Sequence, residues 1–166
     1  MGASRSLVVF YSRSGTTRRI AQALSEALKC DFEQIDEPRN RIGVLGYIRS
    51  LMEARWNRPS AIAPIKHEVS SYDLVVIGTP VWAWSVSSPV RAYLMATANR
   101  LPEVAFFCTL GASGSERTFA QMTAITGKKP RSVCAITARE VTSGNYLMRL
   151  SAFEKALEIR GAGGEN

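Results

Sequence analysis

The stretch LVVFYSRSGTT, residues 7–17, decides the fold. It begins with five consecutive apolar or aromatic residues, Leu7 to Tyr11, and ends in a loop that holds one glycine and four hydroxyl side chains. An apolar run without alternation is typical of a strand buried on both faces, as in a parallel sheet covered by helices. Apolar residues then recur at helical spacing from Ile20 to Leu28. The stretch therefore predicts a strand, a loop and a helix that open an α/β domain.

The same alternation continues along the chain. Further strand-like runs cover residues 32–35, 74–77, 104–108 and 132–137, and helix-like spacing covers residues 90–98, 119–125 and 146–157. A further helix is predicted from about Val44 to Arg55. This pattern predicts a doubly wound three-layer sandwich, in which a five-stranded parallel sheet lies between two layers of helices.

Length and composition fit one folded domain. The chain has 166 residues, of which 46% are hydrophobic, so it can bury a core without disulfides or metal. We expect a single domain over residues 1–160 and a flexible tail over 161–166. No apolar run is long enough to span a bilayer, and we expect a cytoplasmic protein.

The cysteines and the charge narrow the function classes. Cys30, Cys108 and Cys134 are odd in number and form no C-x-x-C pair, which argues against a disulfide framework and a metal centre. Cys108 and Cys134 lie in apolar runs, where a buried, inert thiol is usual. The net charge of +7 favours acidic partners, but no nucleic-acid-binding motif accompanies it. We expect no nucleic-acid partner and no metal site.

Three loops follow the predicted strands at the carboxyl edge of the sheet, where open α/β sheets bind ligands. The first contains Ser12, Arg13, Ser14, Gly15, Thr16 and Thr17. At a helix N-terminus, free backbone N–H groups and hydroxyls can bind a phosphate. The alternative is that these hydroxyls only cap the helix.

The second loop contains Thr79, Pro80, Val81, Trp82, Ala83 and Trp84. In an extended loop the two indoles point the same way and can stack on a flat aromatic ring. The alternative is that they are core tryptophans. The third loop covers residues 109–115, and its backbone N–H groups at Gly111, Ala112, Ser113 and Gly114 could approach a ligand. The alternative is a plain turn with Ser115 as N-cap.

Two motifs identify a resemblance. The first loop fits [ST]-x-[ST]-G-x-T, and residues 78–89 fit G-T-P-x-[WY]-x-x-x-x-x-x-P. The chain resembles the flavodoxin family from Leu7 to about Leu157. The resemblance implies the strand order 2-1-3-4-5 and FMN as cofactor, with its phosphate on the first loop and its ring along the second. It also implies electron transfer to a redox partner protein or a small-molecule acceptor, by a monomer or homodimer without catalytic residues.

Two other functions are weighed against an electron carrier. Electron-carrier flavodoxins are typically acidic, whereas this chain is basic, and its third loop has no tyrosine to cover the outer face of the ring. The open space would suit an FMN-dependent NAD(P)H:quinone-type oxidoreductase, although we find no NAD(P)H motif. A response-regulator receiver would need an acidic cluster at the strand ends, which the sequence does not place there.

Overall fold

A computed structural model describes residues 4–37, 48, 52 and 62–159 of the chain. The helix predicted from Val44 to Arg55 lies outside the described residues, apart from Ile48 and Met52. The predicted tail, residues 161–166, also lies outside them. Among the described residues, no helix combines the length and the apolar character that a membrane span requires.

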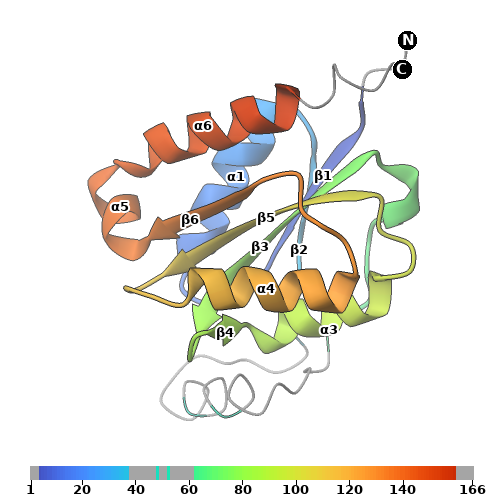
Figure 1. The fold of residues 1–166 in the computed structure, drawn as a ribbon, viewed down its shortest axis with the longest axis horizontal. Coiled ribbons are helices and arrows are strands. Elements are labelled where there is room, and N and C mark those ends of the chain that lie inside the picture. The colour runs from blue at the N-terminus through green and yellow to red at the C-terminus, as the bar shows by residue number, and fades with distance from the viewer. Residues whose placement is uncertain (1–3, 38–47, 49–51, 53–61, 160–166) are drawn as a thin grey trace.

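The sheet has the predicted order. Its parallel strands run β2-β1-β3-β5-β6, which is the order 2-1-3-4-5 once the short strand β4 is set aside (Figure 1). Their bounds are β1 (Ser6–Phe10), β2 (Asp31–Gln34), β3 (Leu74–Trp82), β5 (Glu103–Leu110) and β6 (Val133–Thr137). The additional strand β4 (Ser85–Val86) pairs antiparallel with the end of β3. The predicted fold class is therefore confirmed.

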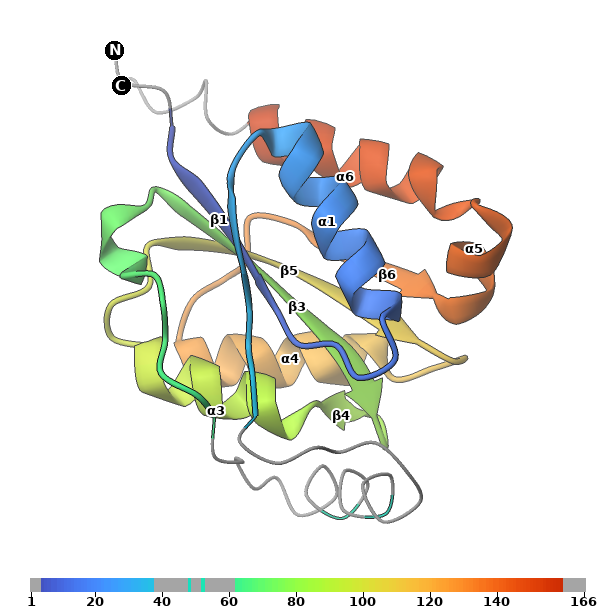
Figure 2. The same ribbon diagram turned by 180° about the vertical axis from the view of Figure 1, so that it is seen from behind.

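Helices cover both faces of the sheet. One layer holds α1 (Thr16–Leu28), α5 (Ala138–Ser143) and α6 (Tyr146–Ile159). The other holds α3 (Ser88–Thr97) and α4 (Ser115–Thr126), and the turn η1 (Val69–Ser71) precedes β3. Figures 1 and 2 show the two layers from opposite sides. The result is the expected three-layer sandwich.

The central strand β1 explains why its apolar run does not alternate. Leu7 and Val9 pack in the core under α3 and α4, whereas Val8 and Phe10 pack in the core under α1 and α6. All four side chains are fully buried. A strand between two helix layers needs apolar residues on both faces.

The short helix α5 is not among the helices predicted from the sequence. Thr137 is its N-cap, and its hydroxyl accepts the N–H of Glu140 at 3.2 Å. The Glu140 carboxylate accepts the N–H of Thr137 at 2.8 Å in return, which completes a capping box. Six residues are too few to show helical spacing, so the apolar pattern gave no signal.

Two buried thiols lie on neighbouring strands. Burial raises the pKa of Cys108 to about 12 and the pKa of Cys134 to about 11. Both side chains therefore stay protonated near neutral pH, as expected of inert core thiols.

Close packing against Gly78 generates the first prediction. A Cβ atom built there would lie 2.0 Å from Cζ of the buried Phe107 ring. We expect Gly78→Ala to lower the free energy of unfolding by about 1–3 kcal/mol, because the ring must shift in a filled core. Urea unfolding followed by circular dichroism measures it. Gly111→Ala is the matched control, since its Cβ would meet nothing within 4 Å. Equal stability of both variants would contradict the close contact.

The capping box generates a second prediction. Hydrogen bonds lower the pKa of Glu140 to about 2. The N–H of Thr137 contributes most to this shift, and the Arg149 guanidinium contributes next. An unfolded glutamate titrates near about 4.3, so this contribution to stability is present above that pH and is lost as the pH falls toward about 2.

We expect Glu140→Gln to lower the free energy of unfolding at about pH 6 by roughly 1 kcal/mol, a value kept small because the pair is solvent-screened. The difference from the wild type should shrink as the pH falls through the range in which the carboxylate protonates. Urea unfolding across that range measures it. Parallel stability curves for the two proteins would show that the carboxylate does not hold α5.

Candidate functional site

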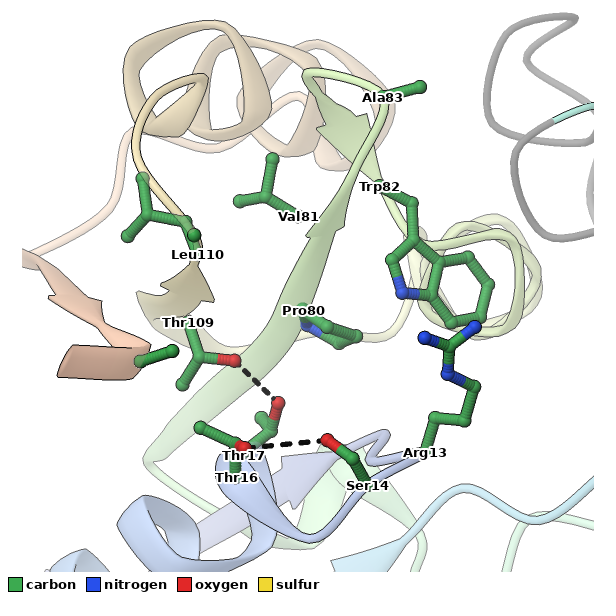
Figure 3. A pocket seen from close by; sticks show the side chains of 12 residues that line it. Arg13, Ser14, Thr16, Thr17, Pro80, Val81, Trp82, Ala83, Thr109 and Leu110 are labelled. Atoms are coloured by element: carbon green, nitrogen blue, oxygen red, sulfur yellow. Dashed lines mark hydrogen bonds between the residues drawn. The ribbon is translucent and has the colours of Figure 1, made fainter. Parts of the chain in front are cut away.

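A cavity of about 400 Å³ opens at the carboxyl edge of the sheet. Its walls come from the loop after β1, the end of β3, the end of β5 and the start of α5 (Figure 3). The lining residues are Arg13, Ser14, Thr16, Thr17, Pro80, Val81, Trp82, Ala83, Thr109, Leu110, Gly111 and Ala138. This volume is within the usual range for small-molecule sites.

The loop after β1 leaves the first turn of α1 open. Gly15 is the N-cap with φ 93°, and no side chain of the described residues caps the helix. Ser12 instead accepts the N–H of Gly15 itself at 3.1 Å, and the hydroxyls of Ser14 and Thr16 lie 3.3 Å apart. These hydroxyls therefore do not cap α1, which was the alternative interpretation of the loop. Uncapped N–H groups and nearby hydroxyls form an anion-binding arrangement.

A buried pair of hydroxyls joins this loop to the far side of the cavity. Thr17 and Thr109 share a hydrogen bond of 2.7 Å between their Oγ1 atoms, although they are 92 residues apart (Figure 3). Both side chains are almost fully buried. The bond fixes the start of α1 against the end of β5, so the sheet holds the loop after β1 in place.

The wall after β3 is a hairpin, not the extended loop that the sequence predicted. Strand β3 continues to Trp82, and the chain reverses at Ala83 and Trp84 into β4. The turn residues have φ 48° and 58°, the left-handed values of a two-residue hairpin turn. The two indoles therefore do not point the same way. Trp82 is 8% exposed and lines the cavity, whereas Trp84 is 61% exposed and lies outside its lining.

Helix α4 holds this hairpin in place. Gln121 accepts the N–H of Val86 at 3.0 Å and donates to the hydroxyl of Ser85 at 3.1 Å. The side-chain oxygen of Gln121 that accepts the N–H of Val86 also accepts a hydrogen bond from the Arg91 guanidinium at 3.2 Å. The turn carries positive φ values on two residues with side chains, and these bonds stabilise that unfavourable backbone.

The third loop packs against the outside of the hairpin. Trp84 donates its indole N–H to the hydroxyl of Ser113 at 3.0 Å. Gly114 has φ 107°, and a Cβ atom there would lie 2.9 Å from Cα of Trp84. Gly114 is the N-cap of α4, so the alternative interpretation, in which Ser115 caps this helix, does not hold. The glycine is needed both for its backbone conformation and for the close approach of the hairpin.

Trp82 lies close to one aromatic and one charged side chain. Its ring meets Tyr11 edge to face at a centroid distance of 5.5 Å. The Arg13 guanidinium carbon lies 5.9 Å from its ring centroid. Figure 3 shows the two side chains next to each other. The indole is thus fixed at the cavity wall with a positive charge beside it.

The structure brings together residues from all three predicted loops. Those that line the cavity are Arg13, Ser14, Thr16, Thr17, Pro80, Val81, Trp82, Ala83 and Gly111. Those that lie outside its lining are Ser12, Gly15, Thr79, Trp84, Ala112, Ser113 and Gly114. Among the latter, Thr79 is fully buried and its Oγ1 accepts the N–H of Ser87 at 3.1 Å, behind the hairpin.

Three lining residues were not among the predicted site residues: Thr109, Leu110 and Ala138. Thr109 and Leu110 belong to β5, which runs further than its apolar run indicated. Ala138 directly follows β6. Its position at the carboxyl end of a strand was the one available signal, because its side chain suggests no chemistry.

Comparison with known proteins gives a family match. The family profile described as flavodoxin matches residues 5–134, which is most of the chain and includes all three loops.

Solved structures share the fold. A flavoprotein from Lactobacillus acidophilus NCFM, solved in complex with FMN, has a TM-score of 0.71 at 22% identity and covers 85% of this chain and 98% of its own. A protein from Bacteroides eggerthii assigned as a flavoprotein has a TM-score of 0.70 at 19% identity, with 89% and 98% covered.

A curated relative from Cupriavidus metallidurans, an NAD(P)H dehydrogenase (quinone), is 25% identical over 91 residues. The matched region is 55% of this chain and 45% of the relative. This chain therefore matches slightly less than half the length of that protein.

Proposed function

Because this chain belongs to the flavodoxin family, we propose that it binds FMN in the cleft at the carboxyl edge of the sheet and acts in electron transfer. The observation that carries the proposal is the uncapped first turn of α1, with hydroxyls around it at one end of a cavity of about 400 Å³. The FMN-bound relative with the same fold supports the choice of cofactor.

The loop after β1 fits the phosphate of FMN. The N–H groups of the first turn of α1 have no side-chain acceptor among the described residues, and the hydroxyls of Ser14 and Thr16 lie beside them. A phosphate dianion supplies several acceptor oxygens and a negative charge, which the positive end of the helix dipole favours. Gly15 leaves open space, since a Cβ atom there would meet nothing within 4 Å.

The opposite wall fits the isoalloxazine ring. Pro80, Val81 and Trp82 present apolar surface toward the cavity, and Trp82 is held by Tyr11. Stacking of a flat ring on an indole adds about 0.5–1.5 kcal/mol beyond the burial of area. Bound flavin supplies the redox chemistry, and the chain positions it and sets the charge around it. Arg13, on the cavity wall, would stabilise an anionic reduced ring and raise its potential.

The partner is a redox protein or a small-molecule acceptor, and the net charge of +7 favours an acidic one. No metal and no nucleic acid takes part in this proposal. The cytoplasmic location and the choice between monomer and homodimer stay predictions, which cell fractionation and size-exclusion chromatography would test.

Comparison of FMN with riboflavin tests the phosphate site. We expect the double variant Ser14→Ala, Thr16→Val to weaken FMN binding by at least about 100-fold, because two hydrogen bonds to a charged group are lost and each is worth about 1.5–3 kcal/mol. Riboflavin, which has no phosphate, should bind both proteins equally. Trp82→Ala should weaken the binding of both ligands, because it removes the stacking surface.

The measurement is quenching of flavin fluorescence in a titration, with Ser151→Ala on the exposed face of α6 as the control. An equal loss of affinity for both ligands in the double variant would place the phosphate elsewhere. Absence of the flavin absorption bands near about 375 and 450 nm after addition of FMN would reject the cofactor.

A second candidate is an FMN-dependent NAD(P)H:quinone-type oxidoreductase, which the partial match to an NAD(P)H dehydrogenase (quinone) favours. Steady-state oxidation of NADPH and NADH with benzoquinone as acceptor separates the two functions. An enzyme of this kind should turn over about once per second or faster. We expect the FMN-loaded protein to stay far below this rate, and rapid turnover would favour the reductase.

A further inference from the structure

Exposed arginines gather at the edge of the molecule that holds the cleft. Arg18 and Arg19 lie in the first turn of α1, Arg117 in the first turn of α4 and Arg139 in the first turn of α5. All three helices begin where parallel strands end, beside the hairpin of β3 and β4 (Figure 1). Their arginines are therefore arranged on several sides of the same cleft.

Within the described part of the chain, these four arginines have no ion-pair partner. Arg18 donates to the neutral side chain of Gln34 at 3.4 Å. Arginines at the opposite edge differ, because each has a carboxylate: Arg5 pairs with Asp31, Arg100 with Glu68 and Arg131 with Glu103. The cleft edge has two acidic residues in its first turns, Glu116 and Glu140, and Glu140 is already paired with Arg149.

Local stability does not account for this arrangement. The N-terminus of a helix is the positive end of its dipole, so a cation in the first turn is disfavoured. Helix α1 has no acidic residue in its first turn to offset Arg18 and Arg19. An uncompensated positive potential at a binding cleft is instead what attracts negatively charged partners.

Apolar side chains are exposed at the same edge. Leu147 and Met148, at the start of α6, are 60% and 83% exposed, and Trp84 on the hairpin is 61% exposed. Exposed apolar residues next to unpaired charges are typical of a protein interface with an apolar centre and a charged rim. A small anion or a nucleotide would not cover Leu147 and Met148.

We propose that this edge is the docking face for an acidic redox protein, which contacts Arg19, Arg117 and Arg139 and covers Leu147 and Met148. The proposal rests on FMN binding in the cleft, because a partner that exchanges electrons must dock near the exposed edge of the flavin. One electron passes from reduced flavin to each one-electron acceptor, so two acceptors oxidise one fully reduced flavin.

Two forms of one haem protein test the proposal. The FMN-loaded protein is reduced with dithionite and mixed in a stopped-flow instrument with native cytochrome c, which is basic, or with succinylated cytochrome c, which is acidic. We expect the acidic form to be reduced at least tenfold faster at low ionic strength, the lower end of electrostatic steering. Added salt should slow the reaction of the acidic form and speed that of the native form.

Matched charge variants locate the docking face. The triple variant Arg19→Gln, Arg117→Gln, Arg139→Gln should reduce the preference for the acidic form at least severalfold. The control, Lys128→Gln, Lys129→Gln, Lys155→Gln, also removes three positive charges, but from the opposite edge. It should keep the preference for the acidic form. A second readout is free of redox chemistry: zinc-substituted, succinylated cytochrome c should shift the backbone amide resonances of Arg139, Leu147 and Met148.

The outcomes separate this proposal from FMN binding itself. If the protein takes up FMN but reduces both forms at the same rate, or if both triple variants behave alike, the docking face is wrong and the cofactor proposal stands. If the arginine variant loses only reduction by NADPH, the arginines bind a nucleotide and the docking proposal is overturned. If no flavin binds, the absorption spectrum shows it before mixing and both proposals fail.

Discussion

The site depends on one constraint: the first turn of α1 begins at a glycine and is left without a side-chain cap. A helix that starts in this way has N–H groups that must be satisfied by solvent or by a ligand. At α5, by contrast, Thr137 and Glu140 satisfy such groups through a capping box. The difference is local chemistry, because Ser12 turns its hydroxyl back to the N–H of Gly15 instead of reaching into the helix.

The sheet and most helices could be predicted because their signals are local. Strand β1 is buried between two helix layers, and its unbroken apolar run records that burial directly. The sequence of the loop after β1 also allowed only a few interpretations, because serine, threonine and glycine before a helix either cap the helix or bind an anion. For the same reason the family resemblance rested on short segments next to strands, where the backbone approaches a ligand.

The hairpin after β3 could not be predicted, because its cause is not local. Ala83 and Trp84 are not the glycine or asparagine that usually adopts positive φ in a two-residue turn. Their conformation is fixed by Gln121, which lies 35 residues beyond Val86, and by Ser113 and Gly114 on another loop. Sequence spacing therefore identified Trp82 and Trp84 as residues at the edge of the sheet but assigned both indoles the same direction.

The groups that give the cleft edge its positive charge are not the groups that line the cleft for a phosphate. A bound phosphate dianion would be met by helix N–H groups and hydroxyls, which hold no formal charge, so it does not require the exposed arginines on α1, α4 and α5. Within residues 4–37 and 62–159, those arginines also have no carboxylate partner of the kind that neutralises their counterparts at the opposite edge. In the two proposals, cofactor binding and partner attraction use separate groups, so either set of residues could change in sequence while the other is kept. A flavin-binding fold can in this way reverse the charge of its docking face without rebuilding the cleft.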